Sequence, residues 1–120
     1  FFHQLLWWSP NNIYQNVYAN SLSGRADTIN FWTEVEPLFS SLPNNTYMFA
    51  GDVGAFANGS EFMYHKYDNV TLVASGMGGE IRDNIVIIDV LEDKTTSFRL
   101  IALNGSDMNS LGKLEDYVLP

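Results

Sequence analysis

The chain has 120 residues, of which 46% are hydrophobic and 14% aromatic, enough for one domain with a core and unlike a disordered segment. Six basic residues against fourteen acidic ones give a net charge of −8, which argues against general nucleic-acid binding and against docking on anionic membranes. There is no cysteine, hence no disulfide framework, and no apolar run approaches the roughly 20 residues of a membrane span. The compartment is not indicated by these features.

The chain begins with a predicted strand and a long loop. Residues 1–8, "FFHQLLWW", are apolar enough for a buried strand and its exit. A native domain rarely begins with such a strand, because terminal residues are usually polar and loose, so we expect a piece of a longer protein. Residues 11–27 are rich in Asn and Ser with scattered aromatic residues, which predicts a loop.

An amphipathic helix is predicted after this loop and ends near residue 42. Its apolar residues recur at spacings of three and four, as one face of a helix requires: Ile29, Trp32, Val35 and Phe39. Asp27 or Thr28 can cap its start. Pro37 lacks a backbone N–H group, so we expect a bend or an interruption there.

The remainder of the chain is dominated by predicted strands. These are residues 46–50, 61–67 and 69–76, followed by two strands of a hairpin within residues 83–103. Residues 76–80, "GMGGE", read as a flexible turn, and residues 104–120 as a polar tail without a clear period. This order predicts an α/β or α+β layered sheet with an antiparallel finish.

A carboxylate at the end of a predicted strand is the first candidate for a functional site. In "YMFAGDVGAF", residues 47–56, Gly51 ends the predicted strand, Asp52 follows at once, and Gly54 is a second permissive backbone position. Open α/β sheets place ligand-contacting groups at the carboxyl ends of their strands. An ordinary tight turn also favours Asp, so the residues alone leave both interpretations open.

The two histidines each have a structural and a functional interpretation. His3 lies in the first predicted strand, where a neutral imidazole is a suitable metal ligand or general acid. The alternative is a histidine that is hydrogen-bonded in a core or loop. His65 alternates with Met63 and Tyr67 on one face of a predicted strand, which favours a sheet-face position over a ligand role.

Glycines and aromatic residues give two further candidate sets. Gly76, Gly78 and Gly79 can cradle an anion through backbone N–H groups, but without a P-loop lysine and a following helix a strand-ending turn is favoured. Several aromatic residues either stack sugars or bases or pack under the long loop: Trp7, Trp8, Tyr14, Tyr18 and Trp32. No Ser/His/Asp or Cys/His set has a recognisable spacing.

The order of these segments resembles the carboxyl-terminal half of the calcineurin-like metallophosphoesterases. In that family a strand ends in a metal-binding histidine within a segment like "HQPLW", which His3 in "FFHQLLWW" matches. A helix of the form "W…L…PLL" follows, as in "FWTEVEPLF", and a strand then delivers a Gly-His-x-His motif at the place of "YMFAGDVGAF". With the Gly-rich turn of "VASGMGG", the resemblance covers most of residues 1–103.

This resemblance implies that residues 1–120 are the carboxyl-terminal portion of a single metallophosphoesterase-like domain, part of a two-sheet β-sandwich flanked by helices. The intact protein would hydrolyse small-molecule phosphomono- or phosphodiesters with two divalent metal ions (Mn, Fe, Zn or Mg). His3 would be a metal ligand, and Asp52 a ligand or a supporting carboxylate in place of a histidine. The partner of this chain would be the missing amino-terminal half of the domain.

The chain also departs from the family pattern. Asp52 stands where the first motif histidine would be, and Gly54, which has no side chain, where the second would be. The motifs that carry most metal ligands and the catalytic histidine, Asp-x-His, Gly-Asp-x-x-Asp and Gly-Asn-His-Asp/Glu, lie earlier in the fold and match nothing here. We therefore expect this chain alone to be inactive and to bind no metal tightly. The alternative is a degenerate, non-catalytic family member or an unrelated β-rich binding domain.

Overall fold

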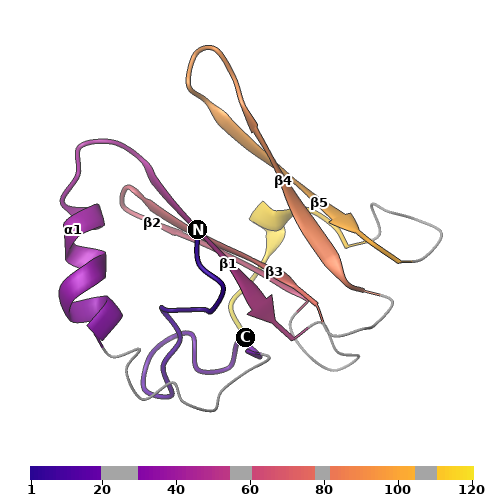
Figure 1. The fold of residues 1–120 in the computed structure, drawn as a ribbon, viewed down its shortest axis with the longest axis horizontal. Helices are drawn as coiled ribbons and strands as arrows, with labels where there is room; N and C mark the ends of the chain where they lie inside the picture. The colour runs from indigo at the N-terminus through magenta and orange to yellow at the C-terminus, as the bar shows by residue number, and fades with distance from the viewer. Residues whose placement is uncertain (20–29, 55–60, 78–81, 105–110) are drawn as a thin grey trace.

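The computed structural model is drawn as a ribbon in Figure 1, and the residues it describes are 1–19, 30–54, 61–77, 82–104 and 111–120. Its helices and strands are the π-helix η2 (Phe31–Val35), α1 (Glu36–Ser40), β1 (Thr46–Val53), β2 (Phe62–Tyr67), β3 (Val70–Gly76), β4 (Asn84–Val90), β5 (Thr96–Ala102) and the 3-10 helix η3 (Leu114–Asp116). This part of the chain is therefore mostly β-strands in two sheets with one short α-helix. A strand-rich mixed fold, as predicted, is confirmed at that level.

The central strand of the larger sheet is β3. The strand order is β1-β3-β2, with β1 parallel and β2 antiparallel to β3. In "VTLVASG" every residue except Ser75 is buried. A strand of β-branched and apolar residues suits this central position, because both of its faces must be covered. The three strands predicted between residues 46 and 76 are confirmed, although β1 extends further than expected.

The helix and the β4–β5 hairpin lie on opposite sides of this sheet (Figure 1). Successive side chains of a strand point to opposite faces, which explains how β1 and β3 contribute side chains to the clusters on both sides of the sheet. Met48 and Leu72 pack with Phe31 in a cluster on the helix side. Val73, with Phe49 packed against it, belongs to a second cluster on the hairpin side.

The helix changes type along its length. The π-helix η2 runs directly into α1 at Glu36, beside Pro37. The helix is not interrupted at Pro37, because helical geometry continues through this residue to Ser40. Pro37 stands in the first turn of α1, just after the change from π to α geometry, where a missing N–H group is tolerated. The caps predicted at Asp27 or Thr28, and the apolar Ile29, lie outside the described residues.

The predicted hairpin of residues 83–103 is confirmed as the antiparallel pair β4 and β5. Its turn is closed by two backbone bonds of 2.9 Å, from Leu91 N–H to the Thr95 carbonyl and from Lys94 N–H to the Leu91 carbonyl. Asp93 accepts hydrogen bonds from the Thr95 hydroxyl and backbone N–H, which lower the pKa of Asp93. These bonds close the turn that joins β4 to β5.

The described end of the chain is docked on the fold and does not form a loose polar tail. Leu111 and Leu114 are 7% and 1% exposed and join the cluster that contains Val73 and Leu100. The short helix η3 carries Leu114 into this cluster. A single turn of 3-10 helix between polar residues is too short to produce a period in the sequence, which explains why the docking was not predicted.

Candidate functional site

The candidate metal site predicted at the carboxyl end of β1 lies where the first residues of the chain run beside that strand. Phe2 forms a parallel bridge with Ala50. Its N–H group donates to the Phe49 carbonyl at 2.7 Å, and its carbonyl accepts from Gly51 N–H at 3.3 Å. The strand predicted for residues 1–8 is reduced to this single bridge, but the bridge aligns His3 with the end of β1.

The end of β1 is irregular at the residues that the sequence singles out. The pairing of β1 with β3 shifts register between Ala50 and Val53, and Asp52 there has a φ of 72°, in the left-handed region. A Cβ atom added at Gly51 would lie 3.5 Å from the His3 carbonyl oxygen, so the two backbones are in contact. The prediction that Gly51 ends the strand is wrong: β1 continues through a bulge to Val53.

His3 and Asp52 lie in neighbouring segments of this sheet edge. His3 is exposed and Asp52 is half-buried. Within the described ranges, no three or more His, Cys, Asp or Glu residues are grouped so that they could hold a metal ion. The metal-binding role of both residues stays a prediction, with one imidazole and one carboxylate as its donors.

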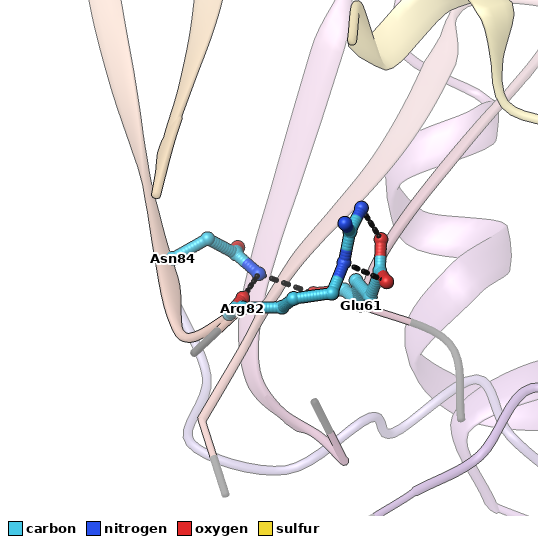
Figure 2. Close-up of polar contacts among 3 residues, drawn as sticks. All are labelled: Glu61, Arg82 and Asn84. Atoms are coloured by element: carbon cyan, nitrogen blue, oxygen red, sulfur yellow. Dashed lines mark hydrogen bonds and ion pairs between the residues drawn. The ribbon is translucent and has the colours of Figure 1, made fainter. Parts of the chain in front are cut away.

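A polar network ties the hairpin to the end of the sheet at which β1 and β3 finish. Figure 2 shows Arg82 paired with the Glu61 carboxylate, and the Asn84 amide directed at the carbonyl oxygens of Glu61 and Arg82. The Asn84 Oδ1 atom accepts a further bond of 3.2 Å from Gly76 N–H at the end of β3. Asn84 is fully buried, and these bonds satisfy its amide. The network fixes the start of β4 beside the end of β3.

The anion-cradle interpretation of the glycine-rich segment is tested only in part. Gly76 is buried as the last residue of β3, which agrees with a strand that ends there. Gly78 and Gly79 lie outside the described residues.

A hollow of about 410 Å³ lies among aromatic side chains of the amino-terminal loop, η2 and β2, and we call it the aromatic hollow. Its lining residues are Asn12, Ile13, Tyr14, Trp32, His65 and Tyr67. Four of these rings form a closed circuit of neighbours. The ring centroids are 5.7 Å apart for Tyr14–Trp32, 6.5 Å for Trp32–Tyr67, 5.7 Å for Tyr67–His65 and 5.6 Å for His65–Tyr14.

The polar atoms of these rings are hydrogen-bonded, and their protonation states follow from burial. The Tyr14 hydroxyl and His65 Nδ1 are joined by a bond of 2.8 Å, and the Tyr67 hydroxyl donates to Glu36 Oε1 at 3.2 Å. Burial, and secondly the charge of Glu36, raise the pKa values of Tyr14 and Tyr67 far above their ordinary values. Burial lowers the pKa of His65. The four rings are therefore neutral at neutral pH, beside the Glu36 carboxylate.

The sequence predicted several of these positions but not their meeting. The sheet-face position predicted for His65 is confirmed, and Trp7 and Tyr14 are buried, so packing is the correct interpretation for those two residues. Tyr18 is 51% exposed, and Trp32 is half-buried. Tyr14 and His65 are 51 residues apart in the chain, and no local period links them. Only the tertiary fold assembles the aromatic hollow.

Comparison with protein-family models, with curated proteins and with solved structures finds no match to this chain. Among the described residues, no helix has both the length and the apolar character needed to cross a membrane.

Proposed function

We propose that the chain is the carboxyl-terminal part of a metal-dependent, metallophosphoesterase-like protein that hydrolyses phosphomono- or phosphodiesters, with His3 as a metal ligand and Asp52 as a ligand or supporting carboxylate. The observation that carries the proposal is the parallel bridge between Phe2 and Ala50. It brings the residue after Phe2 and the residues after Ala50 to one end of the sheet. Carboxyl ends of parallel strands are where α/β folds gather ligand-contacting groups.

The backbone of Asp52 supports a role beyond that of an ordinary strand residue. A left-handed φ is uncommon outside glycine, although Asp adopts it more readily than most residues. Bulges are frequent next to active sites because they re-aim a side chain. The bulge between Ala50 and Val53 gives Asp52 a direction that a regular strand would not.

The donor chemistry fits a divalent metal but is incomplete. An imidazole and a carboxylate together suit Mn, Fe, Zn or Mg. When bound, such metal ions activate a water molecule and hold the phosphate oxygens. His3 and Asp52 supply two donors, so the remaining ligands would come from the missing amino-terminal half of the domain. In this chain alone we expect weak metal binding that adds little stability.

The space between the two sheets supports such a partner. A hollow of about 200 Å³ is lined by Phe1 and Phe49 from one part of the fold and by Val86 and Ile88 of β4. In β4 the apolar residues after Asn84 are half-covered or exposed, although the sequence of the strand is that of a buried one. In the proposal these residues belong to one half of a two-sheet sandwich flanked by helices, and the amino-terminal half completes their cover.

The test is metal-dependent hydrolysis by the complete gene product, with bis(p-nitrophenyl) phosphate and p-nitrophenyl phosphate as substrates. His3→Ala should lower kcat by orders of magnitude and reduce the bound metal, with a cooperative melt retained. Asp52→Asn should lower metal affinity or activity, and Asp52→His should retain part of both. Glu92→Gln, in the exposed hairpin turn, is the charge-matched control and should leave both unchanged. Full activity and metal content in His3→Ala would refute the proposal.

A degenerate, non-catalytic binding domain is the second candidate. It is favoured by the loss of both motif histidines, at Asp52 and Gly54, and by the presence of the aromatic hollow. The coding sequence upstream of Phe1 separates the two candidates. Intact Asp-x-His, Gly-Asp-x-x-Asp and Gly-Asn-His-Asp/Glu motifs there support the enzyme, and altered or missing motifs support the binding domain.

A further inference from the structure

Several polar groups that line the aromatic hollow already have partners within the protein. Asn12 Nδ2 donates to the Trp7 carbonyl at 2.8 Å, and Asn12 Oδ1 accepts from Tyr14 N–H at 2.9 Å. Trp32 Nε1 donates to the same Trp7 carbonyl at 2.9 Å. Sugars and nucleobases are recognised through hydrogen bonds to their hydroxyls or edges, and the side chains named here have little capacity left to make them. Tyr14 is only 1% exposed, so the aromatic surface that the hollow offers a ligand comes from Trp32, His65 and Tyr67.

The electrostatic environment of this surface is negative. The faces of aromatic rings carry negative potential, which attracts cations. Glu36 is half-buried and bonded to the Tyr67 hydroxyl, so its carboxylate is held beside the rings. Neither Lys nor Arg occurs among the described residues that line the hollow, and burial keeps His65 neutral at neutral pH. The net charge of −8 adds a long-range attraction for cations.

We propose that the aromatic hollow binds an alkylated ammonium group, with a trimethylammonium head as the best fit. Such a group combines a positive charge with an apolar methyl surface and needs no hydrogen-bond acceptors. Quaternary ammonium ligands are recognised by clusters of aromatic rings for this reason. The hollow, at about 410 Å³, leaves room for a short substituent on the head.

This site is separate from the proposed metal site and does not depend on it. His65 pairs with Leu72 in the middle of β3, whereas Asp52 lies beyond Ala50, which pairs with Ala74 nearer the carboxyl end of β3. Loss of ligand binding at the hollow would therefore leave the metal proposal unaffected, and the converse holds.

The first test compares choline with 3,3-dimethylbutan-1-ol, its neutral isostere, in titrations followed by tryptophan fluorescence and by amide NMR. We expect saturable binding of choline with a dissociation constant of roughly millimolar size, and binding of the isostere about tenfold weaker. The amide signals of Trp32, His65 and Tyr67 should shift, while those of the β4–β5 turn should not. Equal affinity for the isostere, or no saturation, would overturn the proposal.

The second test removes the charge beside the hollow. Glu36→Gln keeps an oxygen that can accept from Tyr67, and it should weaken choline binding several-fold. Glu92→Gln makes the same charge change in the exposed hairpin turn and should leave choline affinity unchanged. An equal loss in both variants would reduce the effect to overall charge and contradict the proposal. If Glu36→Gln does not fold, the NMR shifts of the wild-type chain decide the question.

The source of the ammonium group is distinguished in the same assay. Free choline and an acetylated trimethyl-lysine amide carry the same head on different substituents. Tighter binding of choline identifies a small metabolite as the source, and tighter binding of the trimethyl-lysine amide identifies a methylated peptide. A neutral sugar such as methyl β-glucoside is the counter-probe, and tighter binding of it than of choline would overturn the proposal.

Discussion

Two strands of equal length and similar apolar character, β3 and β4, are buried very differently. In β3, "VTLVASG", every residue but Ser75 is buried, because β1 and β2 flank the strand and other layers cover both its faces. In β4, "NIVIIDV", only Asn84 is buried, and Val90 is 70% exposed. An apolar strand sequence therefore predicts that both faces of the strand are buried, but it does not identify the elements that bury them. The described residues supply that cover for β3 and only part of it for β4.

The largest expected effect is in the cluster on the helix side of the sheet. Trp7 is fully buried, and its indole N–H donates to the Met63 sulfur at 3.1 Å. Trp7→Ala should lower the free energy of unfolding by about 3–5 kcal/mol, since it removes a large buried side chain and leaves a cavity. Urea denaturation measures this loss. A loss below about 1 kcal/mol would show that this cluster is not the main core.

The polar network at Asn84 should come next. Asn84→Ala removes the side-chain acceptor of Gly76 N–H and the amide donor to the carbonyl groups of Glu61 and Arg82. We expect a loss of about 1–3 kcal/mol in the free energy of unfolding. Hydrogen exchange should accelerate in β4 and β5 more than in β3. Uniform acceleration throughout the chain would contradict the view that this network joins two separable parts.

A matched pair of valines sharpens the comparison of the two strands. Val73 in β3 is fully buried, whereas Val86 in β4 is half-buried, and both line the hollow between the sheets. Val73→Ala should cost about 2 kcal/mol and Val86→Ala about half as much, in proportion to the apolar area withdrawn from water. Thermal melts of the two variants test this ratio. Equal losses would mean that β4 is as fully covered as β3.

The smallest effect concerns pH and the aromatic hollow. Burial lowers the pKa of His65 below its ordinary value of 6.5, so the unfolded chain takes up the proton first as the pH falls. The stability that depends on neutral His65 is present above pH 6.5 and is lost as the pH falls through the lowered pKa. Tyr14 and Tyr67, which contact His65, stay neutral over this range. The Glu36 carboxylate accepts a hydrogen bond from the Tyr67 hydroxyl.

His65→Gln should therefore show a smaller drop in Tm than the wild type between about pH 7.5 and pH 5.5. Identical pH profiles for the two proteins would show that His65 titrates as freely in the folded state as in the unfolded one.

The sequence predicted the elements that local patterns specify. It did not predict features that depend on contacts between residues far apart in the chain. The hairpin was predictable because an apolar run on each side of Glu92-Asp93-Lys94 specifies strand, turn and strand. The bulge at Asp52 was not predictable, because it is an irregularity in the pairing of β1 with β3, two strands that are distant in the sequence. Burial of Leu114 and the meeting of Tyr14 with His65 likewise depend on contacts between distant residues.

The candidate metal site was likewise predictable only in part. His3 and Asp52 were named from their places at predicted strand ends and from a family resemblance. That they lie in adjacent segments follows from the bridge between Phe2 and Ala50, which no local pattern encodes.

The most direct test of the account is whether His3 and Asp52 bind one metal ion together. A substoichiometric Mn²⁺ titration of the ¹⁵N-labelled chain, followed by amide NMR, reports which residues lie near the bound ion. We predict that the signals of His3 and Asp52 lose intensity together and before those of the exposed turn at Glu92, and that His3→Ala restores the Asp52 signal. Unchanged broadening at Asp52 in His3→Ala, or equal broadening at all exposed carboxylates, would contradict the shared site.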